Sequence, residues 1–269
     1  MSAAALETLL RRDRVIVGAA LAALTVAAWL YLLHLASAMS DMAMPDMPAM
    51  PGMAMAMPAL HAWSWVEVGA LVVMWGVMMI GMMTPVASPM ILMFSTIHRR
   101  RIAEGGPAVP TAIFVLGYLV VWTIYSVVAA LAQAGLHAAA LLSPGMASTS
   151  PLLAGGLLVA AGVFQWTPLK RACLAACRSP LSFLMTAWRE GRGGAFVMGL
   201  RHGLYCLGCC WALMALLFVA GVMNLLWVAS IAMAILVEKV VPRGDLVGRL
   251  AGVVLVAAGA VLVARGIIG

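Results

Sequence analysis

Charged residues are scarce in this chain of 269 residues, where Asp, Glu, Lys and Arg together make up 9% of the sequence. Soluble domains carry roughly a quarter of such residues, so the composition excludes a soluble enzyme. The net charge of +7 does not indicate a nucleic-acid binder, because basic inner loops give membrane proteins the same excess. Aromatic residues make up only 7%, and strand-like alternation is absent, which argues against a membrane β-barrel.

Apolar residues, in contrast, make up 65% of the chain and form long stretches. A bilayer core of about 30 Å requires about 20 apolar residues per helix. The stretches run over Val15–Ala36, Val66–Phe94, Pro110–Ala132, Pro151–Pro168, Val197–Gly221, Leu225–Val241 and Gly248–Arg265. The sequence therefore predicts an all-α fold, a polytopic transmembrane helical bundle of about seven spans.

Basic residues are distributed unevenly between the connections. With the N-terminus inside, fifteen of the sixteen Lys and Arg residues fall on the inner side, and only Arg265 falls outside. This bias predicts an N-terminus-inside, multi-pass protein of the bacterial inner (cytoplasmic) membrane. Ala36-Ser37-Ala38 resembles a signal-peptidase site, but the apolar stretch before it is longer than a typical signal peptide's, which favours an uncleaved helix.

The predicted spans and the loop between the first two divide the chain into three parts. Residues 1–36 form an N-terminal cytoplasmic tail and the first span, residues 37–62 an outer Met-rich loop, and residues 63–269 a six-span membrane domain. Within the last part, Met79-Ile80-Gly81-Met82-Met83 and Cys206-Leu207-Gly208-Cys209-Cys210 share one template of soft donors around a glycine. The two helices run in opposite directions, as in an inverted repeat of three plus three spans after the first span.

Methionine is the residue in excess, with 22 in the chain and eight of them between Met39 and Met57. Pro45, Pro48 and Pro51 keep this outer segment open and non-helical. Thioether sulfur is a soft donor that selects Cu(I), and it forms no disulfide in an oxidising compartment. The expected ligands are Met39, Met42, Met44, Met47, Met50, Met53, Met55 and Met57, with His34 and His61 at either end. The alternative is a low-complexity linker.

The second predicted span carries further soft donors, Met78, Met79, Met82 and Met83. Their spacing places them on adjoining faces of one helix, where simple apolar packing is the alternative interpretation. Pro85 and Pro89 follow in the inner half of the span. We therefore expect the prolines to disrupt the helix and bend it there, and broken helices of this kind often lie at the substrate or ion sites of transporters.

The fifth predicted span carries the sharpest group of donors, which is His202, Cys206, Cys209, Cys210 and Met214. Spacings of three and four residues place them on one stripe of a helix. Gly203 and Gly208 are expected to let a neighbouring helix approach the sulfurs. A thiolate in hydrocarbon becomes acceptable when a cation neutralises it, which favours a metal site. A packed interface of small cysteines and a thiol-redox pair are the alternatives.

Four other polar residues receive simpler interpretations. Cys173 and Cys177 would share a helical face, but they are expected to be reduced cytosolic thiols in a basic loop. Glu238 and Lys239 lie at the end of an apolar stretch. We expect both side chains to snorkel or to pair at the inner membrane surface.

Several motifs resemble those of a bacterial family of predicted metal-binding integral membrane proteins, whose members are often labelled copper chaperones. The motifs are Met82-Met83-Thr84-Pro85 with Pro89, Phe164-Gln165-Trp166-Thr167-Pro168-Leu169-Lys170 with Cys173 and Cys177-Arg178-Ser179-Pro180, Cys206-Leu207-Gly208-Cys209-Cys210-Trp211-Ala212-Leu213-Met214, Gly221-Val222-Met223-Asn224, and Glu238-Lys239. The resemblance implies metal binding. The Met-rich loop is an addition that is similar to the methionine motifs of periplasmic copper proteins.

These observations predict a membrane copper-binding protein that is not an enzyme. Copper, mainly Cu(I), would be captured on the outer loop and passed by ligand exchange to the intramembrane Met and Cys sites. Its recipient would be the cytoplasm, a periplasmic copper protein or a membrane cuproenzyme. The expected partners are the lipid bilayer and the copper ion, without nucleic acid. The alternatives are an assembly subunit of a membrane complex, with the loop as its docking segment, and a membrane thiol oxidoreductase that uses Cys206 and Cys209.

Overall fold

The structure is a computed structural model that describes residues 3–42, 64–143 and 146–268. Within these ranges the chain is helical and has no strand, and a single isolated bridge joins Leu142 to Ser148. The helices are α1 (Ala3–Met42), α2 (Trp65–Ala103), α3 (Thr111–Ala138), α4 (Pro151–Phe164), α5 (Pro168–Arg178), α6 (Pro180–Ala187), α7 (Gly191–Ala215), α8 (Leu217–Ala220), α9 (Leu225–Val240) and α10 (Gly244–Ile268). The all-α prediction is confirmed.

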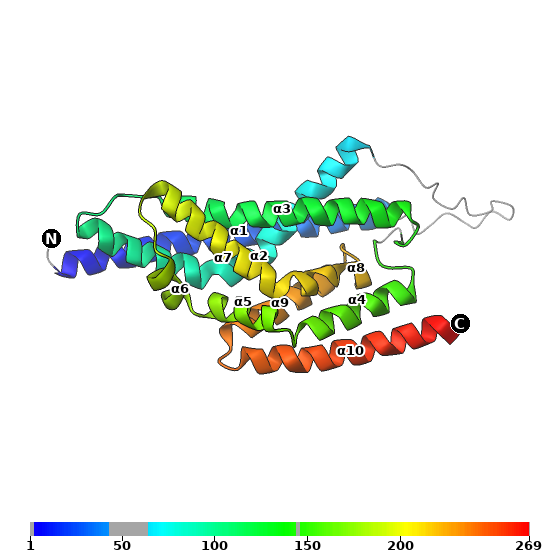
Figure 1. Cartoon of the computed structure of the whole chain (residues 1–269). Helices are drawn as coiled ribbons and strands as arrows, with labels where there is room; N and C mark the ends of the chain where they lie inside the picture. The colour runs from blue at the N-terminus through cyan, green and yellow to red at the C-terminus, as the bar shows by residue number, and fades with distance from the viewer. Residues whose placement is uncertain (1–2, 43–63, 144–145, 269) are drawn as a thin grey trace.

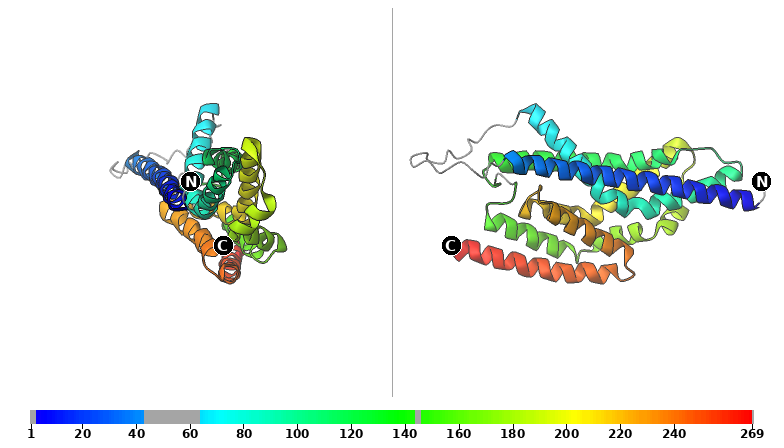
Figure 2. Two further views of the ribbon diagram at one scale, coloured as in Figure 1. Left: turned by 90° about the vertical axis from the view of Figure 1, so that its left-hand side faces the viewer. Right: turned by 180° about the vertical axis from the view of Figure 1, so that it is seen from behind.

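The long helices lie side by side in an elongated bundle (Figures 1 and 2). Helix α1 begins at one end of the bundle, and α10 ends at the other (Figure 1). The connections from α2 to α3, from α6 to α7 and from α9 to α10 lie toward the end where α1 begins (Figure 1). These connections and their flanks carry Arg100, Arg189 and Arg243, so basic charge gathers at this end as the sequence predicts.

Among the described residues, five helical segments are long and apolar enough to cross a membrane. They are formed by α1, α2, α3, α7 with α8, and α10. Helices α4 and α5 are bent by 65° at their junction and count as a sixth if the pair is one broken span. Helix α9 has 16 residues, which corresponds to about 24 Å at the α-helical rise. It is therefore shorter than a bilayer core of about 30 Å, and the count of seven spans is not confirmed.

The break between α4 and α5 has a local cause. Pro168 has no N–H group and cannot continue the hydrogen bonding of α4, but it fits the first turn of a new helix. The hydroxyl of Thr167 caps this helix by accepting from the N–H of Lys170 at 3.2 Å. The short helix α5, which carries Cys173 and Cys177, therefore leaves the axis of α4 at an angle.

Helix α2 is continuous from Trp65 to Ala103, with Pro85 and Pro89 inside it. The two prolines therefore do not end the helix in its inner half, and the expected bend stays a prediction. Pro89 leaves the carbonyl of Pro85 without its usual helical donor, since proline has no N–H. The hydroxyl of Ser88 donates to that carbonyl at 2.8 Å, which compensates for the missing hydrogen bond and lets the helix continue.

Helix α1 continues to Met42, beyond the end of the predicted first span. Met39 and Met42 are therefore helical, and their assignment to an open loop is wrong. The physical reason is the position of the helix-breaking residues, because the first proline of the segment is Pro45. Met44, Met47, Met50, Met53, Met55, Met57 and His61 lie outside the described residues.

Glycine allows two pairs of helices to pack with their backbones in contact. Between α3 and α7, a Cβ on Gly117 or Gly199 would collide with the backbone of the opposite helix, and one on Gly203 would meet Val121 at 2.9 Å. Between α4 and α10, a Cβ on Gly155 would lie 2.7 Å from the carbonyl oxygen of Gly259. Such small-residue contacts are a main source of helix association in membranes. The first of these crossings positions the candidate site.

Candidate metal centre

Helix α7 carries the donors of the candidate site on one buried stripe. His202, Cys206, Cys209, Cys210 and Met214 are each at most 3% exposed. Helix α7 runs without a break from Gly191 to Ala215, so spacings of three and four residues bring these side chains to one side. The stripe predicted from the sequence is confirmed as a structural feature.

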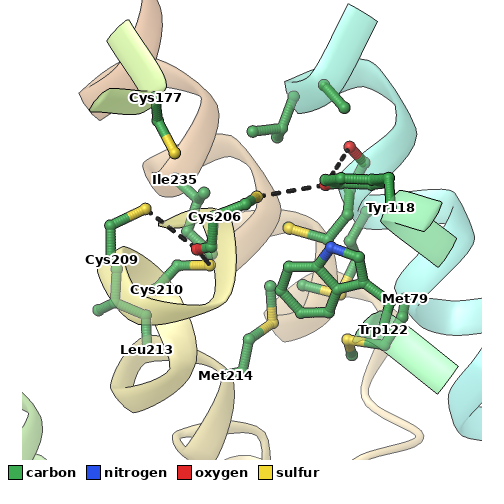
Figure 3. Close-up of a cluster of buried hydrophobic side chains, with 14 of the residues drawn as sticks. Met79, Tyr118, Trp122, Cys177, Cys206, Cys209, Cys210, Leu213, Met214 and Ile235 are labelled. Atoms are coloured by element: carbon green, nitrogen blue, oxygen red, sulfur yellow. Dashed lines mark hydrogen bonds between the residues drawn. The ribbon is translucent and has the colours of Figure 1, made fainter. Parts of the chain in front are cut away.

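The thiols of this stripe lie close together and are all free (Figure 3). The thiols of Cys209 and Cys210 donate to the backbone carbonyl of Cys206 at 3.1 and 2.9 Å. Cys177 of α5 points its sulfur toward them (Figure 3). We refer to Cys177, Cys206, Cys209 and Cys210 as the thiol cluster.

Sequence reasoning missed the contribution of α5 to this cluster. Cys173 and Cys177 lie in a helix and are both buried, so their placement in a basic loop is wrong. Gly208 of α7 makes the approach of α5 close, since a Cβ there would stand 2.7 Å from the sulfur of Cys173. The four-residue spacing of the two cysteines indicated a shared face, and only the packing of α5 on α7 shows where that face points.

Two side chains from other helices contact the sulfur of Cys206. The hydroxyl of Tyr118 in α3 lies 3.2 Å from it, and the ammonium of Lys239 in α9 donates to it at 2.9 Å. Tyr118 also donates to the carbonyl of Met83 in α2 at 3.3 Å, which links the thiol cluster to the methionine-bearing helix. An ammonium within hydrogen-bonding distance stabilises the anionic form of a thiol. We expected Lys239 to snorkel or to pair at the membrane surface, and the structure gives it a thiol as its partner.

The neighbouring residue Glu238 is buried, and it is paired, which was one of the two outcomes expected for it. Its carboxylate accepts two hydrogen bonds from the ammonium of Lys170 in α5, at 2.7 and 2.9 Å. Glu238 is 3% and Lys170 2% exposed, so the pair is almost completely withdrawn from solvent. The pair joins α9, which carries Lys239, to α5, which carries Cys177.

Thioether side chains extend the buried sulfur toward the rest of α2. Met78, Met79, Met82 and Met83 are each at most 1% exposed, and they belong to the same hydrophobic core as the thiol cluster and Met214. The side chain of Met214 points toward the indole of Trp122 (Figure 3). The indole N–H of Trp122 is buried and has no hydrogen-bond partner in the described part of the chain. Burial alone agrees with thioether ligands and with ordinary packing.

A cavity of about 240 Å³ adjoins the thiol cluster. Cys177, His202, Lys239 and Met90 line it. The Nδ1 atom of His202 is buried and has no partner among the described residues, while the ring stacks on Tyr118 at 5.6 Å between centroids. The cavity therefore offers a nitrogen and sulfur donors in one place.

Among the described residues, no three His, Cys, Asp or Glu side chains take an arrangement that could hold a metal ion. The reason lies in the orientation of the thiols, since those of Cys209 and Cys210 are turned to the carbonyl of Cys206. A cation would bind only after these thiols rotate, and soft sulfur donors of this kind select Cu(I).

The remaining predicted ligand in the described part of the chain does not join this site. His34 lies on α1 with its side chain exposed, away from the buried sulfurs. The backbone positions of Met39 and Met42 are helical, as described above. The structure thus unites the donors of α7 with Cys177 in one cluster and leaves His34 apart from it.

Comparison with known proteins identifies the family. No curated protein and no solved structure matches the chain. The family described as copper chaperone, PpoB2, matches residues 72–262, a range that includes the thiol cluster, Lys170, Glu238 and Lys239. The Met-rich segment lies before the matched range. The match confirms the resemblance drawn from the motifs, and the chain belongs to the PpoB2 family of copper chaperones.

Proposed function

We propose that the chain is a membrane copper chaperone that holds Cu(I) on the thiol cluster and passes it to another protein. The observation that carries the proposal is the convergence of four buried thiols from α5 and α7, one of them bonded to Lys239. Thiolates are soft ligands for Cu(I), and a nearby ammonium lets one of them remain anionic in a dry site. Ordinary packing does not require such a charge.

The route to the cluster follows from the order of the donors along the molecule. Copper is captured by the outer Met-rich segment, passes to Met78, Met79, Met82 and Met83 of α2, and reaches the cluster. Each transfer forms one copper–sulfur bond as another breaks, so the oxidation state does not change. A thiolate is charged and a thioether is neutral, so transfer from methionine to cysteine is favourable. This route assumes seven spans with the N-terminus inside, in the bacterial inner membrane.

Lys239 has a direct role in this cycle. Its ammonium is bonded to Cys206, on a side of that sulfur which a metal ion would use. Binding of Cu(I) therefore requires the ammonium to move, and the adjoining cavity, which Lys239 itself lines, provides the space. The chain's own residues bind and exchange the ion without any chemical conversion, which makes it a carrier and not an enzyme.

The test is Cu(I) binding by the purified full chain under reducing conditions, measured against a competitor dye. Cys206→Ser and Cys209→Ser are expected to weaken binding at least about tenfold, which corresponds to about 1.4 kcal/mol. Cys173→Ser is the matched control, because this buried thiol packs on Gly208 and makes no hydrogen bond to the other cysteines. Unchanged affinity in both cluster variants contradicts the proposal.

The methionine step is tested separately. Met79→Leu keeps the packing volume but removes the thioether, and it is expected to slow the loading of the cluster from an external Cu(I) complex. Met233→Leu is the control, since Met233 of α9 is 58% exposed and belongs to no buried sulfur group. Equal loading rates in the two variants would show that the α2 methionines only pack.

A further inference from the structure

A second cavity lies at the end of the bundle where α1 begins, between the end of α2 and the start of α3. Its volume is about 300 Å³, at the lower limit of the ~300–1,000 Å³ typical of small-molecule sites. Ser95, Arg99, Thr111 and Arg192 are among the residues that line it. It shares no lining residue with the cavity beside the thiol cluster, so it is a separate feature.

Ser95 and Arg192 supply this cavity with hydrogen-bond donors that lack acceptors among the described residues, whereas Arg99 is paired with Asp13. Ser95 is 3% exposed, and its hydroxyl makes no hydrogen bond with any described residue. Arg192 is exposed and forms no ion pair within the described part of the chain. Helix α3 also starts at the cavity, and its N-cap residue Pro110 provides no side-chain hydrogen bond. Such a group of donors fits an anion with several oxygen atoms.

The walls of the cavity are held in place by specific contacts. The Nε2 atom of His98 accepts a hydrogen bond from the backbone N–H of Val109 at 2.8 Å, which fixes the α2–α3 connection over the end of α2. The ring of His98 stacks on Phe94 with centroids 5.7 Å apart. Arg99 forms an ion pair with Asp13 of α1, so three helices are joined at this point. The cavity is therefore part of a packed structure.

An apolar groove begins where this cavity ends. It lies between α1 and α3, has a volume of about 430 Å³, and is lined by residues such as Ile16, Ala20, Ala112 and Leu116. No charged residue lines the groove, and Thr111 lines both the groove and the cavity that contains Arg99 and Arg192. The ion pair of Asp13 lies about one helical turn before Ile16, at the boundary between the two spaces.

We propose that the cavity and the groove together bind one anionic phospholipid. Its phosphate lies among Ser95, Arg99 and Arg192 at the start of α3, and an acyl chain lies in the groove between α1 and α3. Charge complementarity selects an anionic headgroup, because basic pockets on the inner side of membrane proteins attract such lipids. A zwitterionic headgroup would bring its ammonium toward the two arginines. The proposal is independent of copper binding.

The experiment uses the purified full chain in a non-ionic detergent, with phosphatidylglycerol or phosphatidylcholine added in equal amounts. Native mass spectrometry counts the lipids that remain bound. The wild type is expected to retain one phosphatidylglycerol at least about tenfold more strongly than phosphatidylcholine, equivalent to about 1.4 kcal/mol. The double variant Ser95→Ala/Arg192→Gln is expected to lose this preference, while the control Arg171→Gln, an exposed arginine on α5, retains it.

A second variant tests the groove without disturbing the cavity. Ala112→Trp places a large side chain in the groove at a position that faces outward from the bundle, and it is expected to expel the bound lipid while the fold remains intact. An unchanged melting temperature without lipid verifies folding. Equal retention of the two lipids overturns the proposal. So does displacement of the lipid by inorganic phosphate, or a dimer of the chain in place of the lipid-bound form.

Discussion

Two lysines support the thiol cluster through different contacts. Lys170 of α5 neutralises Glu238 of α9 in a nearly dry site. Lys239, which follows Glu238 on α9, donates to the sulfur of Cys206. Adjacent residues of one helix thus place a carboxylate against α5 and an ammonium against α7. Because charges without partners are costly in hydrocarbon, each of these contacts restricts how the three helices pack.

The buried ion pair leads to a prediction about stability. Lys170→Met leaves the carboxylate of Glu238 buried without a partner, and we expect it to lower the free energy of unfolding by about 3–5 kcal/mol. The double variant Lys170→Met/Glu238→Leu removes both charges and is expected to recover most of this loss. Unfolding in detergent, followed by the exposure of the five buried cysteines to a thiol reagent, measures both effects. Additive losses in the double variant would contradict the coupling.

The residues of the site differ in how far the sequence predicts them. The stripe from His202 to Met214 follows from the helical period, because all its members belong to one helix. Cys177 and Lys239 reach the same cluster from helices that are distant in the sequence, so no local spacing reveals them. Lys239 was expected to snorkel or to pair at the inner membrane surface because it lies at the end of a span, and that expectation does not include a sulfur partner from another helix.

The crossing of α3 and α7 is the contact between helices that sets the site. Gly117 and Gly199 bring the two backbones together, and Gly203 lies one turn beyond Gly199. Tyr118 follows Gly117 directly and reaches the sulfur of Cys206 at 3.2 Å. The distance from phenol to thiol therefore depends on three residues that have no side chain.

A methyl group at this crossing tests its role. Gly199→Ala would bring a Cβ into collision with the carbonyl of Phe114, and we expect the helices to separate at a cost of about 1–3 kcal/mol. Copper affinity should fall as well, since Tyr118 moves away from Cys206. Gly193→Ala is the control on the same helix, because nothing lies within 4 Å of the added Cβ there. Thermal unfolding and Cu(I) titration measure the stability and the copper affinity of both variants. Equal melting temperatures and equal affinities in the two variants would refute the prediction.

The helices themselves were predictable, but their ends and breaks were less so. The apolar stretch Leu225–Val241 matches α9 within one residue, since Asn224 caps its start by accepting from the N–H of Trp227. The stretch Val66–Phe94 was too short by nine residues at its end, because α2 continues through polar residues to Ala103. Pro85 and Pro89 did not break this helix, since Ser88 covers the freed carbonyl. Such compensation depends on a rotamer that sequence spacing does not specify.

The molecule as a whole divides into a matched part and an added part. Residues 72–262 carry the family match, the thiol cluster and its supporting charges. Helix α1 and the Met-rich segment precede this range. Since α1 packs its Ala28 against Gly81 of α2, the added part is attached to the helix that carries the buried methionines. This arrangement suggests that capture of copper and its retention are separable properties.

Separability leads to a prediction about copper loading. Replacing Met44, Met47, Met50, Met53, Met55 and Met57 by Leu removes the outer thioethers but leaves the thiol cluster unchanged. We expect the variant to bind as much Cu(I) as the wild type at saturation but to load more slowly at low copper, because closely spaced thioethers raise the effective concentration of ligand.

A chain in which residues 43–57 are shuffled keeps all six thioethers and serves as the control. If the chain binds copper through an open segment, the order of its residues matters little, so the shuffled chain should load like the wild type. Loading rates measured by stopped-flow with a Cu(I) dye complex separate the two variants, and an equally fast leucine variant would show that the segment has no part in capture.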